Sequence, residues 1–249
     1  MNILVIGDSC TDIFIYGDIK RICPEAPVPV FNPTDENQNP GMALNVVENL
    51  KSLGCDVDII TNSNKIKKIR YVDTRSNQMV LRVDEHDYCE PLDSGMLNNL
   101  RTDYNAVIVS DYCKGFLSKL DIKYICDNFK NVFVDTKKQI GEWIMNAKYI
   151  KINEFEHMKN FEIIPNYPII KRKLIITGGS KGCVHNGKHY PVKDVPVKDV
   201  SGAGDTFISG LVYNYVRTKD IRGSILFAQK CTTEVVQKHG VSTIKIEEL

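Results

Sequence analysis

The most informative stretch of the chain reads Asp199-Val200-Ser201-Gly202-Ala203-Gly204-Asp205-Thr206-Phe207. It is a turn of small residues that runs directly into an apolar helical pattern at residues 203–217. Glycines let consecutive backbone N–H groups point in one direction, and the start of a helix adds partial positive charge. We therefore predict an anion site at Gly202, Ala203 and Gly204, suited to the charge that develops on a phosphoryl group in transfer.

Asp205 falls in the first turn of that predicted helix. A carboxylate beside an anion site can accept the proton of an attacking hydroxyl, so Asp205 is the candidate catalytic base. The stretch by itself leaves an alternative open, in which Ser201 caps the helix and Asp205 only complements the helix dipole.

A second glycine-rich segment, residues 177–182, follows a strand-like run at residues 174–177. Open α/β sheets bind ligands at the carboxyl ends of their strands, so this segment is a candidate ligand site. A simple hairpin turn explains it equally well. The segment is not a Walker A loop, and the chain contains no G-x-G-x-x-G, so nucleotide folds of those two kinds are disfavoured.

Two carboxylates, Asp8 and Asp12, come just after the first strand-like run, residues 2–6. Charged acceptors at the end of a strand suit the hydroxyl groups of a sugar. Capping of a turn or helix is the alternative for both.

Strand-like and helix-like segments alternate along the chain, which predicts an α/β fold with a mostly parallel central sheet and helices on both faces. Buried strands are expected at residues 2–6, 56–60, 106–110, 131–135, 148–152 and 174–177. Helices are expected at residues 42–53, 117–129, 203–217 and 221–238.

Residues 28–31 and 67–83 break this rhythm, because their polar alternation is typical of a small antiparallel β flap. We place the flap strands within about residues 13–31 and 65–84. The sequence shows no linker and no repeat, so we expect one domain over residues 1–249.

The composition excludes several functions. The 249 residues include 32 Lys+Arg and 31 Asp+Glu, and a formal net charge of +1 gives no footprint for nucleic acid or an anionic membrane. The one dense basic run, residues 65–70, alternates in a way that favours a solvated strand edge. No apolar run approaches the roughly 20 residues of a membrane span.

The start of the chain lacks the features of a signal peptide, and the eight cysteines include no C-x-x-C pair. Both observations favour reduced thiols in a cytoplasm and disfavour a zinc site. His185 and His189 are separated by Asn186-Gly187, which predicts a hairpin rather than a metal pair.

With these residues in view, the chain resembles the ribokinase/PfkB family of carbohydrate kinases over essentially its whole length. Residues 199–205 match the family's D-x-x-G-A-G-D signature. Further matches are Tyr16-Gly17-Asp18, Arg21-Ile22-Cys23-Pro24-Glu25-Ala26-Pro27-Val28-Pro29-Val30, Asn77-Gln78, Arg82-Val83-Asp84, Ser110-Asp111-Tyr112-Cys113-Lys114-Gly115 and Lys238-His239-Gly240-Val241-Ser242-Thr243. The second of these is nearly diagnostic of the subgroup that phosphorylates D-glycero-β-D-manno-heptose 7-phosphate at its anomeric hydroxyl.

The resemblance implies a ribokinase-like fold with a β-sheet lid, ATP and Mg²⁺ as cofactors, and a role for each matching residue. Asp205 would be the base, and Gly202, Ala203 and Gly204 the anion hole. ATP would bind Thr177, Gly179 and Gly182, with residues 225–236 near the adenine. The sugar would bind Asp8, Asp12, Gly41 and Asn45, and Arg21 and Lys114 are candidates for the substrate's own phosphate. Asp199 is a candidate site for K⁺, as in some relatives.

The chain also departs from the family pattern. Met42 stands where the sugar motif Gly-Gly-x-x-x-Asn has its second glycine, so its side chain is expected near the sugar. In the N-x-x-E element, which organises Mg²⁺ and phosphate, Lys151 replaces the asparagine, while Glu154 is kept as an indirect metal ligand. Three consequences of this replacement are open: Lys151 binds phosphate directly, Asn153 takes the place of the missing asparagine, or metal binding is impaired. The family's D-P-K-G stretch reads Asp135-Thr136-Lys137-Lys138.

Relatives also carry a helix and a strand after the segment that ends at Ile60, which this chain lacks. The resulting expectation is an ATP-dependent kinase of a sugar phosphate, first of all the heptose 7-phosphate. A kinase of another sugar and a degenerate sugar-phosphate-binding protein remain as alternatives. We expect no nucleotidyltransferase domain, and the exposed flap edges leave a homodimer through the lid open.

Overall fold

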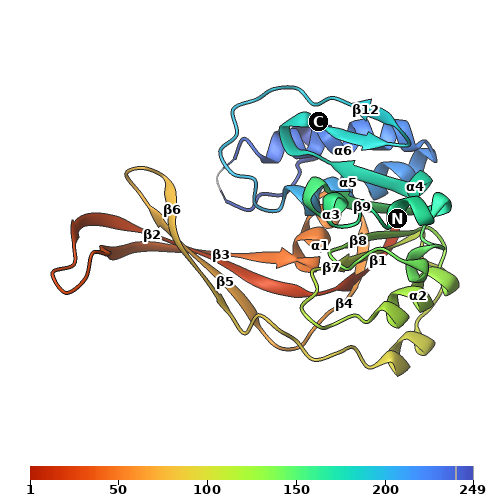
Figure 1. Ribbon diagram of the computed structural model, residues 1–249, viewed down its shortest axis with the longest axis horizontal. Coiled ribbons are helices and arrows are strands. Elements are labelled where there is room, and N and C mark those ends of the chain that lie inside the picture. Colours follow the sequence, from red (N-terminus) through yellow and green to blue (C-terminus); the bar gives the residue numbers. More distant parts are fainter. Residues whose placement is uncertain (239, 249) are drawn as a thin grey trace.

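The structure is a computed structural model that describes residues 1–238 and 240–248. In this part of the chain an eight-stranded central sheet has the order β12-β11-β10-β9-β8-β7-β1-β4 (Figure 1). The strands β1, β4, β7, β8, β9 and β10 are parallel. Their bounds are Asn2–Gly7, Asp56–Ile60, Ala106–Asp111, Val132–Thr136, Tyr149–Asn153 and Leu174–Thr177. The expected α/β fold is confirmed.

Side chains of alternate residues on β1 point to opposite faces of the sheet, which explains how helices cover both. Ile3 and Val5 pack with residues of α1, α5 and α6. Leu4 and Ile6 pack in the cluster that includes α2 and α4. The helices are α1 Ala43–Ser52, α2 Lys119–Asn128, α3 Glu154–Lys159, α4 Pro168–Lys173, α5 Ala203–Thr218 and α6 Ile221–Val235. Short 3₁₀ turns lie at Ser94–Asn99, Glu142–Ile144, Ile164–Asn166, Gly179–Lys181 and Ile246–Glu248.

An antiparallel hairpin completes the central sheet beyond β10. Its strands are β11 Cys183–His185 and β12 Lys188–Tyr190. Asn186 and Gly187 both have positive φ, 48° and 74°, which is the geometry of a tight two-residue hairpin turn. The hairpin expected from Asn186-Gly187 is therefore confirmed.

A second sheet forms an arm that projects from the body, and we call it the lid (Figure 1). Its order is β3-β2-β5-β6, with bounds Pro29–Met42, Ser9–Ile22, Ile66–Asp73 and Gln78–Glu85. The predicted flap was too short, and its antiparallel description was wrong at the centre, where β2 and β5 are parallel. The reason is topological: after β3 the chain passes through α1 and β4 before it enters β5.

The basic run at residues 65–70 was also misjudged. Residues 66–70 of the run lie in β5, which pairs with β2 on one side and β6 on the other, so they are not a strand edge. Lys68 is only 7% exposed. Alternation along a strand reports which face is more polar, but only the strand order decides whether a strand is central.

The connection from β4 to β5 is short, as the sequence predicts for a chain that lacks the relatives' extra helix and strand. It is tied to the start of the lid, because the Ser9 N–H donates to Oδ1 of Asn62 at 2.7 Å and Thr61 donates to the carbonyl of Gly7 at 2.7 Å. Consequently β4 is an edge strand of the central sheet. No helix among residues 1–238 and 240–248 is long and apolar enough to cross a membrane.

Candidate active site

The signature turn begins α5 in a backbone conformation that requires glycine. Gly202 is the N-cap, with a φ of 77°, and no side chain caps the helix. A Cβ atom on Gly202 would lie 2.4 Å from Nδ2 of Asn45, so a larger residue would clash as well as strain the backbone. The alternative in which Ser201 caps this helix is therefore wrong.

The turn presents backbone donors beside an ammonium group. The N–H of Ala203 is already used, since it donates to the carbonyl of Val200 at 3.1 Å. The N–H groups of Gly202 and Gly204 have no acceptor in the described part of the chain. A Cβ atom on Gly204 would lie 2.9 Å from Nζ of Lys151. Donors and a fixed positive charge thus meet at the start of α5, which suits an anion.

Lys151 reaches this position from the carboxyl end of β9. Its Nζ donates to Asp135 at 2.7 Å, and the side chains are 8% and 10% exposed. Burial acts to lower the pKa of Lys151, but the charge of Asp135 and the hydrogen bond to it outweigh burial and leave the pKa above its ordinary value. The ammonium group therefore stays charged beside the turn.

Asp205, in the first turn of α5, is held by two hydrogen bonds. Tyr112 donates its hydroxyl to Oδ1 at 2.7 Å, and Asn45 donates Nδ2 to Oδ2 at 3.0 Å. Burial raises the pKa of Asp205 to about 6, against these two hydrogen bonds, which act to lower it. A carboxylate with such a pKa is mostly ionised at neutral pH and is still a better proton acceptor than an exposed aspartate.

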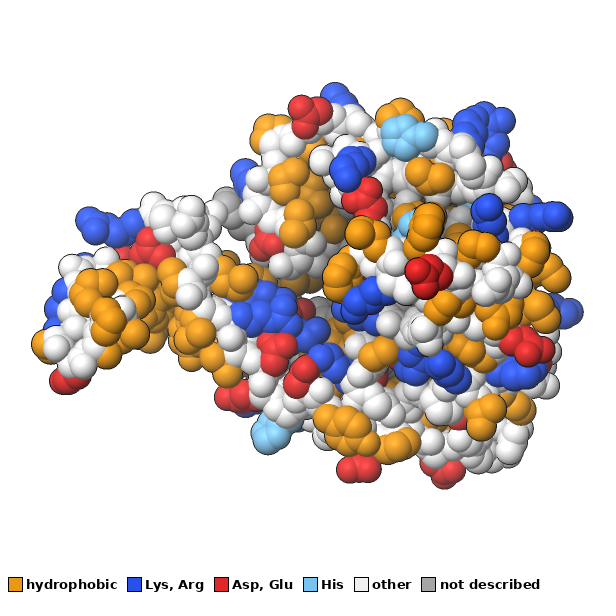
Figure 2. Space-filling model, in the orientation of Figure 1, with side chains coloured by type: hydrophobic (Ala, Val, Ile, Leu, Met, Phe, Trp, Pro, Cys, Tyr) orange, Lys and Arg blue, Asp and Glu red, His pale blue; other side chains and the backbone are white. Residues whose placement is uncertain are grey.

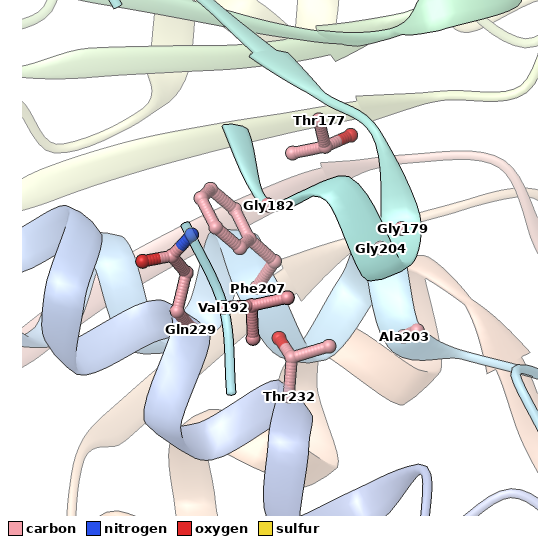
Figure 3. Close-up of a pocket in the computed structure, with 9 residues that line it drawn as sticks. All are labelled: Thr177, Gly179, Gly182, Val192, Ala203, Gly204, Phe207, Gln229 and Thr232. Atoms are coloured by element: carbon pink, nitrogen blue, oxygen red, sulfur yellow. The ribbon is translucent and has the colours of Figure 1, made fainter. Parts of the chain in front are cut away.

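A pocket opens on the other side of this turn, and Thr177, Gly179 and Gly182 all line it (Figure 3). The remaining lining residues are Val192, Ala203, Gly204, Phe207, Gln229 and Thr232. Gln229 and Thr232 belong to α6, the helix that the family resemblance places near the adenine. A neighbouring, mostly apolar hollow shares Gly179, Val192, Ala203 and Thr232 with this pocket. An elongated ligand with a flat apolar part and an anionic end fits this shape and chemistry.

Asp12, Gly41 and Asn45 come together where the lid meets the body. The side chain of Asp12 pairs with Arg70 at 2.5 Å. A Cβ atom on Gly41 would lie 2.2 Å from Oδ2 of Asp12, so a larger residue here would displace the Asp12 carboxylate. Asn45 links the same region to Asp205 through the hydrogen bond described above.

Asp8 has a different position from the one expected for a sugar ligand. It is fully buried, and it accepts hydrogen bonds from the N–H groups of Tyr112 at 2.6 Å and Phe116 at 3.3 Å. Its carboxylate thus fixes the loop after β7, which carries Tyr112. Asp8 supports the site through this loop rather than from the surface of the cleft.

The structure places the two candidate phosphate residues differently. Arg21 is exposed near the tip of the lid, nine residues beyond Asp12 on β2, which is about 30 Å of extended strand. The ammonium group of Lys114 is already paired with Asp87. The motif matches identified both residues, but they could not show that the lid strand places Arg21 far from Asp12.

Met42 occupies a backbone conformation that favours glycine, with a φ of 59° and ψ of −128°. Its side chain is 3% exposed and packs in the core cluster that includes Ile66 and Cys89. Its Sδ lies 3.1 Å from Nζ of Lys68. The thioether therefore reaches the face of the lid that carries Lys68, and its expected position near the sugar stays a prediction.

Sequence reasoning missed the partners of the predicted residues. Tyr112 and Asp135 were noticed only within longer motif matches, and Lys68 only within the basic run. Nothing in their local sequence shows that Tyr112 contacts Asp205 or that Asp135 holds Lys151.

The acidic residues near the pocket form no ready metal site. Across residues 1–238 and 240–248, no three His, Cys, Asp or Glu side chains are grouped so as to hold a metal ion. Glu154 begins α3 and lies 3.2 Å from Lys181, and Asp199 accepts a hydrogen bond from the N–H of Ser201 at 2.8 Å. Within the tail motif at residues 238–243, His239 lies outside the described residues.

Curated relatives match this chain over its whole length. Bifunctional protein HldE of Photobacterium profundum is 30% identical over the whole chain, and HldE of Campylobacter jejuni strain RM1221 is 31% identical. The chain spans 62% and 64% of their lengths. The alignments run over 301 and 293 positions although the chain has 249 residues, so these relatives carry segments that it lacks.

The fold is that of a group of solved kinases. A nucleoside kinase from Methanocaldococcus jannaschii, an archaeal member of the ribokinase family, has a TM-score of 0.73 at 17% identity, covering 98% of this chain and 94% of its own. Ribokinase from Arabidopsis thaliana, solved with ribose and ATP, has a TM-score of 0.69 at 14% identity, covering 98% and 95%. The family model described as "pfkB family carbohydrate kinase" matches residues 117–248, which include the signature turn and α5. The chain therefore belongs to the pfkB family of carbohydrate kinases.

Proposed function

We propose that this chain transfers a phosphoryl group from ATP to the anomeric hydroxyl of a sugar phosphate, and that the acceptor is D-glycero-β-D-manno-heptose 7-phosphate, which becomes the 1,7-bisphosphate. The observation that carries the proposal is Asp205, a buried carboxylate with a pKa of about 6 at the glycine turn of α5. The choice of the heptose is supported by residues 21–30, which resemble the heptose-phosphate subgroup, and by the similarity to HldE proteins.

In this reaction the anomeric hydroxyl gives its proton to Asp205 while its oxygen attacks the terminal phosphorus of ATP. The bond between that phosphorus and the oxygen of the leaving ADP breaks. Negative charge on the transferred group is balanced by the N–H groups of Gly202 and Gly204 and by the ammonium group of Lys151. Lys151 therefore takes the role of a phosphate-binding residue, the first of the three alternatives left open by its replacement of asparagine.

The residues present fit ATP, because the pocket lined by Thr177, Gly179, Gly182 and Thr232 ends at the anion-binding turn. They fit Mg²⁺ less directly: in the described part of the chain no acidic cluster could hold the ion alone. Mg²⁺ would be carried mainly by the ATP phosphates and water, with Glu154 as an indirect ligand, and would neutralise phosphate charge. Asp199 remains the proposed K⁺ site.

We further propose that residues 1–249 form one kinase domain whose lid strands close over the acceptor, and that pairing of two lids would give a homodimer. A second candidate function is motivated by Met42 and by the short connection after β4. If these changes close the acceptor site or loosen the lid, the chain would be a sugar-phosphate-binding protein without turnover. A kinase for a different sugar is the third reading, and it predicts the same chemistry at Asp205.

The test is ADP release with ATP, Mg²⁺ and a panel of acceptors that includes the heptose 7-phosphate, for the wild type and Asp205→Asn. We expect turnover stimulated by the heptose phosphate and reduced about 10²- to 10⁴-fold by the substitution, with ATP binding retained. The matched control is Asp103→Asn, at a side chain that is 76% exposed. Binding of the heptose phosphate without any acceptor-dependent ADP release would instead establish the binding-protein reading.

A further inference from the structure

Lys68 is a buried cation that forms no ion pair with a carboxylate in the described part of the chain. It lies on β5 in register with Asp12 of β2, on the face of the lid that meets the body. Its side chain is buried, and its Nζ lies 3.1 Å from the thioether sulfur of Met42 and 5.1 Å from the ring centroid of Tyr112. A thioether is a weak acceptor, so most of the hydrogen-bonding capacity of this ammonium group is unused.

Lys137 is a second cation beside this ring; it comes from the body rather than the lid, and part of its side chain is exposed to solvent. It directly follows β8, and its Nζ lies 4.1 Å from the centroid of the same Tyr112 ring. Burial lowers the pKa of Lys137, and the positive charge of Lys68 lowers it further. Two like charges thus face one aromatic ring, and an anion bound between them would relieve their repulsion.

The neighbouring cations make the contrast plain. Lys138 pairs with Asp111 at 2.6 Å, Lys151 with Asp135 at 2.7 Å, and Arg70 with Asp12 at 2.5 Å. Around this cleft, Lys68 and Lys137 are the lysines for which no carboxylate partner exists among the described residues. The missing counter-charge is therefore local to the Tyr112 ring.

We propose that Lys68 and Lys137 form the binding site for a phosphate monoester carried by the acceptor itself, at the edge of the Tyr112 ring. This inference rests on the proposed function and specifies its substrate class, a sugar that already bears a phosphate. It replaces Arg21 and Lys114 in that role. Because one lysine belongs to the lid and the other to the body, binding of the phosphate also draws the lid toward the body.

The position of Tyr112 separates this site from the ATP pocket. Its hydroxyl donates to Oδ1 of Asp205, which places the ring next to the base. Neither lysine lines the pocket formed by Thr177, Gly182 and Gln229. The terminal phosphate of ATP is nevertheless the other possible source of the same chemistry, and the experiment must distinguish the two.

The experiment measures binding by calorimetry, without turnover, for three ligands: the heptose 7-phosphate, the same heptose without phosphate, and a non-hydrolysable ATP analogue. Lys68→Met and Lys137→Met should each weaken binding of the heptose phosphate about 10- to 100-fold, as expected for a lost charge-assisted contact. Binding of the unphosphorylated heptose and of the ATP analogue should change less than about threefold. Lys68→Arg should recover most of the affinity, and Lys119→Met, at an exposed lysine of α2, is the matched control.

Two results would overturn the proposal. One is an equal loss of affinity for the phosphorylated and unphosphorylated heptose, and the other is a loss confined to the ATP analogue. Thermal unfolding of the variants checks that they fold, since removing an unpaired buried charge should not lower the melting temperature. If the heptose phosphate does not bind the wild type, the proposed sugar is wrong, and the same variants are tested with inorganic phosphate instead. A lower affinity for inorganic phosphate in the lysine variants would then still support this phosphate site. No phosphate binding at all would refute the site.

Discussion

The two sides of Asp205 are built differently. On the side that we propose binds ATP, the pocket is made mainly by the loop after β10, the start of α5 and α6. On the proposed acceptor side, three lid strands carry Asp12, Lys68 and Met42, which lie near Tyr112 and Lys137 from two loops of the body. Two departures from the family pattern also lie on this side: the residue Met42 and the short connection between β4 and β5. In the proposed function, phosphoryl transfer therefore depends mainly on residues of the body, whereas acceptor recognition depends on how the lid meets the body.

Substitution of Lys151 is the strongest test of the proposed ATP side, because this lysine replaces the asparagine of the family pattern beside the anion-binding turn. Lys151→Met should lower kcat about 10²- to 10³-fold, since it removes a fixed positive charge from the anion site. Lys151→Arg should recover part of the rate, because it keeps the charge. Steady-state ADP release at saturating acceptor measures both.

The same substitution leaves Asp135 buried without its partner, so thermal unfolding should occur at a lower temperature in Lys151→Met. The kinetic comparison is therefore made well below the melting temperature of the variant. A Lys151→Met protein with wild-type kcat would show that the glycine turn alone stabilises the transferred group, and the two sides would then differ less than we argue.

Tyr112→Phe tests the point where the two sides meet. The variant keeps the ring between the lysines but removes a hydrogen bond that stabilises ionised Asp205, so the pKa of that carboxyl should rise above about 6. Only the ionised form accepts a proton, so the acid limb of kcat/KM should move to higher pH by about 0.5–1 unit. At pH 6 the rate should fall about 2- to 5-fold, and at pH 8 it should be close to that of the wild type. An unshifted acid limb would mean that another group controls it.

Met42 gives the smallest effect and concerns the acceptor side alone. A non-glycine residue with a φ of 59° is strained, whereas its buried side chain contributes packing. Both Met42→Gly and Met42→Ala lose the packing, but only glycine relieves the strain. We expect Met42→Gly to be more stable than Met42→Ala by about 1 kcal/mol, the reverse of the usual order in a buried position. Urea unfolding midpoints measure the difference, and the usual order would show that this backbone conformation is not strained.

Much of the fold could be predicted from the sequence because its signals are local. The six parallel strands lie within one residue of their expected positions, since each is a short apolar run bounded by turn residues. The end of the last long helix was placed three residues too late, at 238 instead of Val235. Helix ends depend on which backbone groups find partners, and these partners are not visible in a periodic pattern.

The candidate site divides in the same way. Asp205 and the glycine turn were identified from contiguous residues, because their chemistry depends on the start of one helix. Arg21 was misplaced, because its position depends on a lid strand that runs away from the body. The basic run at residues 65–70 was taken for a solvated edge, because only the order of the strands shows that β5 is central.

By itself, the sequence determined the α/β class, the anion-binding turn and the carboxylate that follows it, since these rest on residues next to one another in the chain. Tertiary structure alone decided that Tyr112 and Asn45 hold Asp205, that Asp135 holds Lys151, and that Lys68 and Lys137 face one ring without an anion. These pairings join residues from different strands, and their energies depend on burial and distance, neither of which a linear pattern contains.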